Sequence, residues 1–574
     1  MTEYQPIKRI CRVSGREFII YPEDQKFYDM MGVNYPTLDP VERSRQRIAF
    51  GPLVTTVYKR KCDATGKELV TYYHPLTPAK IYDRDYWLSD DFDPKIYGRD
   101  FDFGRSFFEQ FRDLLWAVPK FHAINMDGEN SDYTLMGRNN KNCYLVCSFG
   151  CVDTMFSCVR DCREVVDCMN LYDCEGCYEC VSCDFGYNLK FAQFSRQCRD
   201  SMFLYDCHHV SDCIMCVGLK HKQYCIKNRQ LTKEEYERQK ENFDTGSFQS
   251  LENMKKQFAD FCRNFPVREN QNSNCQNVIG DFMKDSENCF MCFQGRNSRG
   301  CRYCMTHCND QINCFDTGSS RSENCLNVGT RSMAKDCKFC HELIGGNNLE
   351  YCYEITATCN DMFGCVGIKT PSEYMILNKQ YTKDKYFELK KKIIAYMKET
   401  GEYGEFFPME MSLFPYHDSF AYEYWPIDER QVTPLVGTDL GLVDFGGKEH
   451  LKIHFRPFEK KDTAEQMYAI EDNIKSYCDE KKQHDLLTAI LICEKTGRPY
   501  RIQPSELYFY IKYNLPIPRE SFYARHPRRA SELTRTNIYQ RNCDHCGKDM
   551  ATVFGKETER EVWCAGCYGE MEGK

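Results

Sequence analysis

The middle of the chain, from Cys143 to Cys365, lacks the helical spacing of apolar residues and instead repeats small apolar residues at short intervals. In its second half, successive anchor cysteines are 11 to 15 residues apart, with a mean just under 13. These anchors are Cys275, Cys289, Cys301, Cys314, Cys325, Cys337, Cys352 and Cys365. Recurrence at this interval without helices is typical of a β-solenoid. The interval fits one coil of a flattened solenoid or half a coil of a wide one.

Eleven cysteines of this region directly follow Asn or Asp, as in Asn142-Cys143 and Asp336-Cys337. Asn and Asp tolerate the left-handed backbone of tight corners, and stacked Asn side chains can satisfy one another's hydrogen bonds. Cysteine is small and apolar, so it suits the narrow interior of a coil. The pattern predicts that most of these cysteines point inward as reduced thiols.

The middle region is also duplicated, because Cys216-Val-Gly218-Leu-Lys220 matches Cys365-Val-Gly367-Ile-Lys369 at an offset of 149 residues. Each half continues into a predicted helix, and Thr232 with Glu235 forms a capping-box pattern at the first. Such a helix would cover the open edge of a solenoid. We therefore expect a mainly β fold with flanking helices, in which a duplicated cysteine-rich parallel β-solenoid occupies residues 141–245 and 246–395.

Two further stretches connect this solenoid to the ends of the chain. Residues 91–140 contain apolar residues at positions 107, 108, 111, 114 and 115, a spacing that predicts an amphipathic helix closing on the solenoid that follows. Residues 396–475 are irregular and rich in aromatic side chains, and we expect them to wrap the flank of the solenoid.

Two CxxC pairs lie near the C-terminus and consist of Cys543, Cys546, Cys564 and Cys567. Gly547 and Gly566 accompany them, and glycine permits the tight turns that such pairs need. Two turns of this kind offer four thiolates to one tetrahedral ion, so the pattern predicts one structural zinc site. The alternative is a disulfide pair or free surface thiols.

The same template recurs with fewer ligands in residues 1–90, a tandem of two degenerate ribbon units, and in residues 476–574, where one degenerate unit precedes the intact one. These copies begin at Cys11, Cys62 and Cys493. In the copy at Cys62 the other ligand positions hold Thr65, Asp83 and Tyr86. One thiolate and one carboxylate do not make a structural zinc site, so we expect this copy to fold without metal. We expect the two tandems to pack together as one head.

The C-terminal unit resembles the zinc-ribbon superfamily. The whole chain resembles a family of uncharacterised cysteine-rich, zinc-ribbon-containing proteins of candidate-phyla bacteria, through Gly98-Arg-Asp-Phe-Asp-Phe103, Lys141-Asn-Cys-Tyr-Leu145 and Gly404-Glu-Phe-Phe-Pro408. This resemblance implies no particular activity. Relatives carry CPxC near the positions filled here by Asp39 and Glu42, and this difference argues against a metal in the first unit.

Composition narrows the location and the partners of the protein. A net charge of −8 over 574 residues argues against a protein that coats nucleic acid indiscriminately. The sequence has no signal-peptide pattern and no run of 18 apolar residues. The 37 cysteines are an odd number and cannot all pair within the chain. We expect a cytoplasmic protein with reduced thiols and no membrane partner.

The run Cys174-Glu-Gly-Cys177-Tyr-Glu-Cys180-Val-Ser-Cys183 permits three interpretations: core and corner thiols, a second zinc site, or an iron–sulfur cluster. Residues three apart on an extended strand point to opposite faces, so only a corner could aim all four sulfurs inward. Other cysteine groups, such as 289/292 and 301/304 with Cys308, offer half a site each. No Walker loop, GxGxxG, HExxH or GxSxG motif is present, which favours a non-enzymatic protein.

Basic residues lead into the intact ribbon, among them Arg519, Arg525, Arg528, Arg529, Arg535 and Arg541. Arginine suits phosphate, so this stretch is a candidate nucleic-acid contact; the alternative is a charge-balanced face. The leading interpretation is a non-enzymatic zinc-binding scaffold that binds a macromolecular partner. The alternatives are an RNA-, DNA- or ribosome-associated protein that acts through the ribbon head, and an iron–sulfur or multi-zinc protein that uses solenoid cysteines for metal or redox chemistry.

Overall fold

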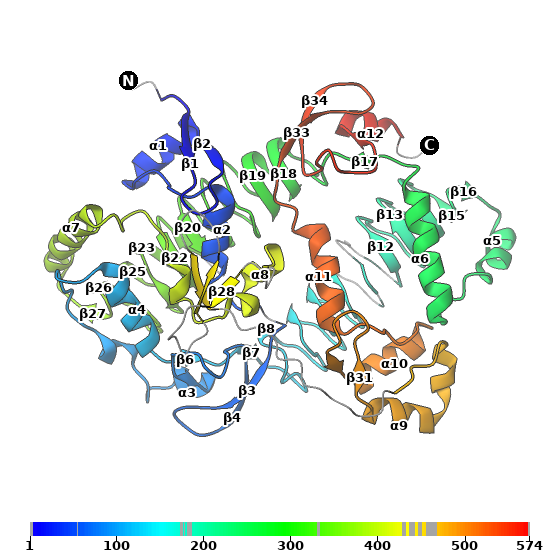
Figure 1. The fold of residues 1–574 in the computed structure, drawn as a ribbon, viewed down its shortest axis with the longest axis horizontal. Helices are drawn as coiled ribbons and strands as arrows, with labels where there is room; N and C mark the ends of the chain where they lie inside the picture. The colour runs from blue at the N-terminus through cyan, green and yellow to red at the C-terminus, as the bar shows by residue number, and fades with distance from the viewer. Residues whose placement is uncertain are drawn as a thin grey trace. The chain divides into compact units, whose positions relative to one another are not determined.

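The computed structural model describes residues 4–53, 55–172, 176, 178–180, 186, 188–329, 333–427, 432–434, 442–445, 451–454 and 468–571. In this part the chain is mainly β, with helices flanking parallel β-solenoids, as the sequence predicts. It divides into two compact units whose segments interleave along the chain (Figure 1). Unit 1 comprises Met1–Ala123, Asn270–Pro457 and Thr536–Ile538; unit 2 comprises Ile124–Glu269, Phe458–Arg535 and Tyr539–Lys574.

The solenoid of unit 2 consists of short strands that pair in parallel from coil to coil. The strands are β7 (Ile124–Met126), β8 (Met136–Arg138), β9 (Cys147–Phe149), β10 (Cys158–Arg160), β11 (Met169–Tyr172), β12 (Lys190–Gln193), β13 (Met202–Tyr205), β14 (Ser211–Val217), β15 (Gln223–Ile226) and β16 (Arg229–Gln230). Met136 pairs with Cys147 and Met202 with Ile214, so a residue meets its partner 11 or 12 positions later. One interval is therefore one complete coil, which decides between the two alternatives that the sequence leaves open.

The solenoid of unit 1 repeats this geometry, with parallel partners 11 to 13 residues apart. Its strands are β18 (Gln276–Lys284), β19 (Glu287–Arg296), β20 (Leu326–Gly329), β21 (Ala334–Lys335), β22 (Lys338–Leu343), β23 (Gly346–Glu350), β24 (Tyr353–Ile355), β25 (Asn360–Phe363), β26 (Glu373–Ile376) and β27 (Lys379–Gln380). In both solenoids the last strand turns back and pairs antiparallel with the strand before it.

A left-handed corner recurs at every third residue of these coils. Between residues 188 and 215, φ lies between 47° and 57° at Asn188, Phe191, Phe194, Gln197, Asp200, Phe203, Asp206, His209, Asp212 and Met215. A coil of twelve residues therefore turns four times and has sides of three residues. The left-handed conformation costs most L-residues roughly 1–2 kcal/mol and is easiest for Asn and Asp, which explains their enrichment at the corners.

The residue that follows each corner points into the coil, so the core has a period of three. Buried members between residues 189 and 219 include Leu189, Ala192, Cys198, Leu204, Cys207, Val210, Cys213, Cys216 and Leu219. The Sγ atom of Cys198 lies 3.3 Å from the carbonyl oxygens of both Arg196 and Cys207, so the weak S–H donor meets backbone acceptors within its own coil and the next. The predicted inward orientation is confirmed for most of the described cysteines of this region, which are buried and form no disulfide among the described residues.

Stacked Asn and Asp side chains run along the outside of the coils, as predicted. In unit 2, the amide of Asn130 donates to Asn142 at 3.0 Å, and the amide of Asn142 donates to Asp153 at 2.8 Å. In unit 1, Asn313 and Asn324 form the equivalent bond at 2.9 Å. Each corner residue thus satisfies its neighbour on the next coil.

A helix follows the last coil of each solenoid. The predicted capping box of Thr232 and Glu235 opens α5 (Lys233–Lys240), whose Tyr236 is buried. In unit 1, α7 (Lys383–Glu399) begins after Thr382 and buries Tyr386. These helices contact β15 and β26, respectively, and so cover the terminal coils.

The predicted amphipathic helix is α4 (Phe107–Ala117). Its Phe107 packs against Tyr351 and Phe363, with ring centroids 5.0 and 5.4 Å apart. Both partners belong to the second half of the predicted solenoid, so the helix packs on that half and not on the half that directly follows it in the sequence. The carboxylate of Glu402 accepts the backbone N–H groups of Phe107 and Phe108 at 3.1 and 2.8 Å, and this N-terminal contact holds the helix in unit 1. The corresponding helix of unit 2 is α6 (Phe248–Cys262).

The connector after α7 packs within unit 1 over its described residues up to 427. It contains η2 (Met409–Met411), η3 (Tyr416–Asp418) and α8 (Phe420–Tyr424), and the ring of Phe407 stacks on Phe111 at 4.5 Å. The short strands β28 (Val432–Pro434), β29 (Leu442–Phe445) and β30 (Leu451–His454) form an antiparallel sheet.

The terminal tandems have matching elements. The N-terminal tandem holds β1 (Ile7–Ile10), β2 (Glu17–Ile20), α1 (Pro22–Met31), α2 (Pro40–Ile48), β3 (Tyr58–Lys61), β4 (Glu68–Thr71), β5 (Ile81–Tyr82) and α3 (Arg84–Leu88). The C-terminal tandem holds α9 (Glu480–Thr488), β31 (Leu491–Ile492), β32 (Pro499–Tyr500), α10 (Pro504–Lys512), α11 (Phe522–Leu533), β33 (Tyr539–Asn542), β34 (Asp549–Thr552), β35 (Val562–Trp563) and α12 (Ala565–Met571). The two tandems belong to different units, so the expectation of one shared head stays a prediction.

A buried ion-pair cluster attaches the C-terminal tandem to the solenoid of unit 2. Arg525 and Arg529 lie one turn apart on α11, and their guanidinium nitrogens lie 2.8 and 2.9 Å from the two carboxylate oxygens of Asp167. All three side chains are buried. The carboxylate of Asp167 therefore holds the tandem on a solenoid corner. Neither arginine is exposed to water, so both depend on this carboxylate to balance their charge.

Unit 1 has an equivalent cluster at matched positions. Arg43 of α2 lies 2.9 Å from the carboxylate of Asp316, and Arg47 donates to the Asp316 carbonyl oxygen at 2.5 Å. These arginines precede those of unit 2 by 482 residues, and Asp316 follows Asp167 by 149. The repeated contact places each tandem on the solenoid of its own unit, far away in the sequence.

Among the described residues, no helix combines the length and the apolar character needed to cross a membrane.

Replacing the inward-pointing Cys207 tests the nature of the core. Its side chain is 0% exposed, and its Sγ atom lies 3.5 and 3.4 Å from the carbonyl oxygens of Tyr205 and Cys216. We expect Cys207→Ala to lower the free energy of unfolding by about 1–2 kcal/mol and Cys207→Asp by about 3–5 kcal/mol, since the carboxylate would be buried unpaired. Denaturant unfolding under reducing conditions measures both, and equal losses would contradict the buried position.

Replacing Asp167 tests the attachment of the tandem. Asp167→Asn should lower the free energy of unfolding by about 3–5 kcal/mol, because two buried guanidinium groups would lose their carboxylate. The control is Asp161→Asn at an exposed corner, where the effect should stay within about 0.5 kcal/mol. A small effect at Asp167 would show that the ion pairs do not hold the tandem.

Candidate metal centre

The four C-terminal cysteines come together at one point. Cys543 and Cys546 lie in the turn between β33 and β34, while Cys564 follows β35 and Cys567 lies in α12. Their Sγ atoms all lie within 4.8 Å of one another, and those of Cys546 and Cys564 are 3.8 Å apart. The structure therefore brings together all four sulfur ligands that the sequence predicts.

Backbone geometry prepares this site. Gly547 has a left-handed φ of 75°, and its N–H group donates to the Cys543 carbonyl oxygen at 2.9 Å, which closes the first turn. The N–H group of Cys564 donates to the Sγ atom of Cys543 at 3.2 Å. Burial opposes ionisation of Cys543, but backbone donors from Cys546, Cys564 and His545 outweigh it and lower the pKa of this thiol to about 6. Contacts with the sulfurs of Cys546 and Cys564 raise the pKa of Cys567.

The arrangement could hold one metal ion through four protein ligands. Four sulfurs select soft or borderline ions and leave no position open for water or substrate. Such a site would stabilise the turns that carry its ligands.

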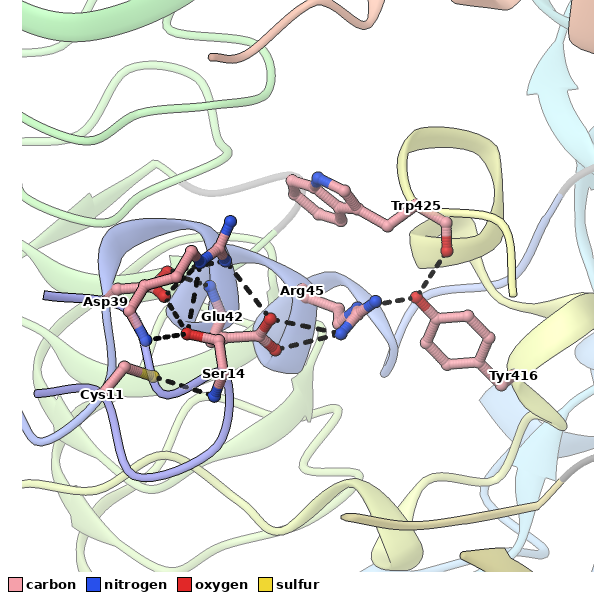
Figure 2. Close-up of polar contacts among 8 residues, drawn as sticks. Cys11, Ser14, Asp39, Glu42, Arg45, Tyr416 and Trp425 are labelled. Carbon is pink, nitrogen blue, oxygen red and sulfur yellow. Dashed lines mark hydrogen bonds and ion pairs between the residues drawn. The ribbon is translucent and has the colours of Figure 1, made fainter. Parts of the chain in front are cut away.

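In the first unit, a guanidinium group occupies the corresponding place. Figure 2 shows Cys11, Ser14, Asp39 and Glu42 close together, and Cys11 and Ser14 match Cys543 and Cys546 in the sequence. The guanidinium of Arg16 lies 3.2 Å from the Ser14 hydroxyl, 3.1 Å from Asp39 and 3.5 Å from Glu42. This unit therefore satisfies its carboxylates with a side-chain cation.

The electrostatics of Asp39 agree with this assignment. Its burial favours the neutral acid, but the Ser14 hydroxyl, the Glu42 N–H group and the Arg16 charge outweigh burial and lower the pKa of Asp39. Asp39 also caps α2 through a hydrogen bond with the Glu42 N–H group at 3.0 Å. Asp39, which stands where a ligand was expected, thus caps the helix that carries Arg43 and Arg47.

The polar network continues from Glu42 to the connector of unit 1 (Figure 2). Arg45 pairs with Glu42 at 3.1 Å and donates to the Tyr416 hydroxyl at 3.0 Å. That hydroxyl in turn donates to the carbonyl oxygen of Trp425 at 2.8 Å. The first unit is therefore locked to the connector by hydrogen bonds.

The copy at Cys62 uses a lysine in the same way. The ammonium of Lys67 lies 2.8 Å from Asp83, one of the substituted ligand positions. The Sγ atom of Cys62 accepts the N–H groups of Thr65 and Asp83 at 3.4 and 3.1 Å. Thr65 and Asp83 thus lie beside Cys62 as predicted, and Tyr86 follows on α3. In the copy at Cys493, Thr496 and Ser521 make the hydrogen bonds to the sulfur.

A second cysteine group, which sequence reasoning treated as half a site, lies inside the solenoid of unit 1. The Sγ atoms of Cys292, Cys304 and Cys308 lie within 4.8 Å of one another, and all three side chains are fully buried. One feature of the sequence could have predicted this group. Cys308 follows Cys304 by four residues, in a coil whose inward positions are otherwise three apart.

Of the four cysteines in the run from Cys174 to Cys183, only Cys180 is described, and it is buried in the core of unit 2. Cys174, Cys177 and Cys183 lie outside the described residues. Cys180 belongs to the period-three series of inward positions. Because each corner resets the strand direction, residues three apart in these coils share the inward face, contrary to the expectation for an extended strand.

The six arginines of the candidate nucleic-acid contact all have carboxylate partners. Arg525 and Arg529 are buried against Asp167, as described above. The remaining four pair at 2.6 to 3.7 Å, namely Arg519 with Glu494, Arg528 with Glu179, Arg535 with Glu532 and Arg541 with Asp544. Burial opposes ionisation of Glu179, but the charges of Lys255 and Arg528 outweigh it and lower its pKa to about 2. This stretch is thus charge-balanced within its own unit.

Comparison with known proteins adds little. No protein-family model and no curated protein matches the chain. Among solved structures, the chain is similar to the crystal structure of a "putative acetyltransferase from Desulfovibrio desulfuricans G20", with 9% identity, coverage of 45% of this chain and 68% of that chain, and a TM-score of 0.10. A similarity this weak carries no argument, so the resemblance to zinc-ribbon proteins stays a prediction.

The first unit offers a test of cation replacement. We expect the combined variant Ser14→Cys, Asp39→Cys, Glu42→Cys and Arg16→Ala to bind one more zinc ion per chain than the parent protein, because it restores four thiolates at matched positions. Metal analysis after anaerobic purification measures the gain. The matched control carries the three new cysteines but keeps Arg16, whose positive charge should weaken zinc binding. Equal zinc contents in the two variants would contradict the idea that Arg16 takes the place of an ion.

Proposed function

We propose that this chain is a non-enzymatic zinc-binding scaffold of the cytoplasm that presents its solenoids to a macromolecular partner. The observation that carries the proposal is the closed set of four sulfurs at Cys543, Cys546, Cys564 and Cys567. Zinc is the ion that most often takes such a set in a structural role, and catalytic zinc sites keep a position open. The matched tandem contacts also support a duplicated architecture, which we infer arose from one repeat.

The shape of the solenoids supports a binding role. Over the described coils their interiors are filled by their own side chains. Their outer corners carry regular rows of Asn and Asp side chains, and stacked coils commonly present such extended surfaces to partners. A long polar surface of this kind suits an elongated partner better than a small molecule.

The polar lining of a cavity in unit 1 also favours a non-enzymatic role. This cavity has a volume of about 490 Å³, and its lining includes Glu42, Glu402 and Glu405. Glu405 binds Arg12 and Thr37 at 3.2 and 2.7 Å, while Glu402 caps α4 and Glu42 binds Arg45. These carboxylates serve structural contacts and are not placed as a general acid or base.

The nucleic-acid alternative receives less support. All six arginines named for it pair with carboxylates, and two of them are buried. Phosphate contacts would have to break these pairs. Titration with single-stranded and duplex RNA at rising salt separates the hypotheses, because a phosphate-binding protein loses affinity steeply with salt. Salt-dependent binding that Arg528→Ala abolishes would favour the alternative.

Zinc removal tests the role of the ribbon. The anaerobic protein should contain one zinc ion per chain; chelation, or Cys543→Ser, should remove the ion and expose the amides of β33 to α12 to hydrogen exchange. The reason is that structural zinc contributes on the order of 10–16 kcal/mol of apparent binding free energy to such units. Amides of the solenoids should keep their protection.

The matched control for this experiment is Cys62→Ser in the degenerate copy, which should retain the full zinc content. A protein without zinc, or one in which chelation unfolds both solenoids, would contradict a local structural role. Retention of zinc by Cys543→Ser would place the ion elsewhere.

A further inference from the structure

The cysteine group inside the solenoid of unit 1 differs from the ordinary stacking of core thiols. In a regular coil, inward cysteines are three residues apart on a side or about twelve apart between coils. Cys292 and Cys304 stack on adjacent coils, but Cys308 follows Cys304 by four residues and joins the same point. Corners at Tyr303 and His307 bracket this four-residue side. The one extra residue in this side therefore brings the sulfur of Cys308 next to the stacked pair of Cys292 and Cys304.

A glycine makes room for the third sulfur. Gly295 lies one coil before Cys308, and a Cβ atom added to it would lie 2.0 Å from the Cys308 carbonyl oxygen and 2.8 Å from the Cys308 Cβ atom. Any side chain at this position would therefore push Cys308 away from Cys292 and Cys304. The close approach of the three thiols depends on a backbone built to allow it.

Polar side chains border the sulfurs in a core that is otherwise apolar. The Thr317 hydroxyl lies 3.1 Å from the Sγ atom of Cys304, and the side-chain oxygen of Gln311 lies 3.5 and 3.7 Å from those of Cys304 and Cys308. Both polar residues are 0% exposed. The Thr317 hydroxyl donates to the Gln311 side-chain oxygen at 2.6 Å, and that oxygen accepts from the Cys304 and Cys308 thiols. Outer contacts of this kind orient metal ligands.

The surrounding charge favours an ionised sulfur. Arg43 pairs with Asp316 at 2.9 Å, and Arg302 pairs with Asp24 at 2.6 Å. Arg47 is 0% exposed, and among the described residues it has no carboxylate within ion-pair distance. Burial lowers the pKa of Arg47 to about 10, against the opposing influence of Asp316 and the Cys304 sulfur. Arg47 therefore supplies a positive charge that a thiolate of the group can balance.

We propose that Cys292, Cys304 and Cys308 form a second metal site, which takes a soft monovalent d¹⁰ cation, Cu(I), in trigonal sulfur coordination. Cysteine thiolates select Cu(I), and the three sulfurs that lie within 4.8 Å of one another match trigonal coordination, whereas structural zinc takes four ligands. Cys301 borders Cys304 and Cys308 but lies outside this set of three. Each thiol that binds releases its proton to solvent. Because the site is fully buried, the cation enters during folding and then holds three coils together.

Refolding tests this site. The full-length protein is unfolded in denaturant under anaerobic, reducing conditions and refolded with one equivalent of Zn²⁺ and an excess of Cu(I) held by a weak chelator. We expect one copper per chain after desalting, with three sulfur neighbours by X-ray absorption. Cys308→Ser should lose this copper, whereas Cys325→Ser, which removes a buried core cysteine outside the group, should retain it.

A variant in which Cys543, Cys546, Cys564 and Cys567 are all replaced by Ser separates this site from the ribbon, since it should lose zinc and keep copper. No retained copper, four sulfur neighbours, or equal copper in Cys308→Ser would overturn the proposal. If Cys308→Ser does not refold, Cys304→Ser and the sulfur count in this ribbon variant decide, because a three-sulfur signal from a protein without any ribbon cysteine can come only from another site. Failure here would leave the zinc scaffold unaffected.

Discussion

The left-handed corner at every third residue is the constraint on which the rest of this structure depends. It shortens each side of a coil to three residues, so that only one side chain in three can point inward and the interior stays narrow. Cysteine fits this interior because its sulfur is small and meets the backbone carbonyl oxygens that face it. The same corners require residues that accept positive φ, and this requirement places Asn and Asp on the outside, where they stack.

Much of this arrangement could be predicted from local sequence. The Asn-Cys and Asp-Cys pairs, the coil interval, the capping box at Thr232 and the four ribbon cysteines are all short-range signals. The period of three could not be recognised as easily, because Leu, Ala, Ser and Val share the inward positions with cysteine. The role of Arg525 and Arg529 was hidden for another reason. Their carboxylate, Asp167, lies more than 350 residues away, and a basic stretch looks the same whether its partner is phosphate or a distant corner.

Positive charge at the ribbon turns links the degenerate and intact units. Where cysteines are replaced by Ser, Asp or Glu, Arg16 and Lys67 reach the carboxylates that would otherwise face one another. A guanidinium cannot match the binding energy of four thiolates, but it requires no metal supply and it is always charged. The tandems then gain stability by docking, since α2 and α11 carry the arginines that meet Asp316 and Asp167. Packing on a solenoid thus supports the units that lack four sulfur ligands.

The interleaved order of the two units has a consequence for synthesis on the ribosome. The solenoid of unit 2 is made early, but the tandem that covers Asp167 is translated more than 300 residues later. The N-terminal tandem emerges first and must wait for Asp316 before Arg43 and Arg47 find their acceptor. Contacts this distant raise the contact order and delay closure until most of the chain has been translated. Buried arginines and solenoid corners therefore remain hydrated and unpaired in the nascent chain, when protection by chaperones matters most.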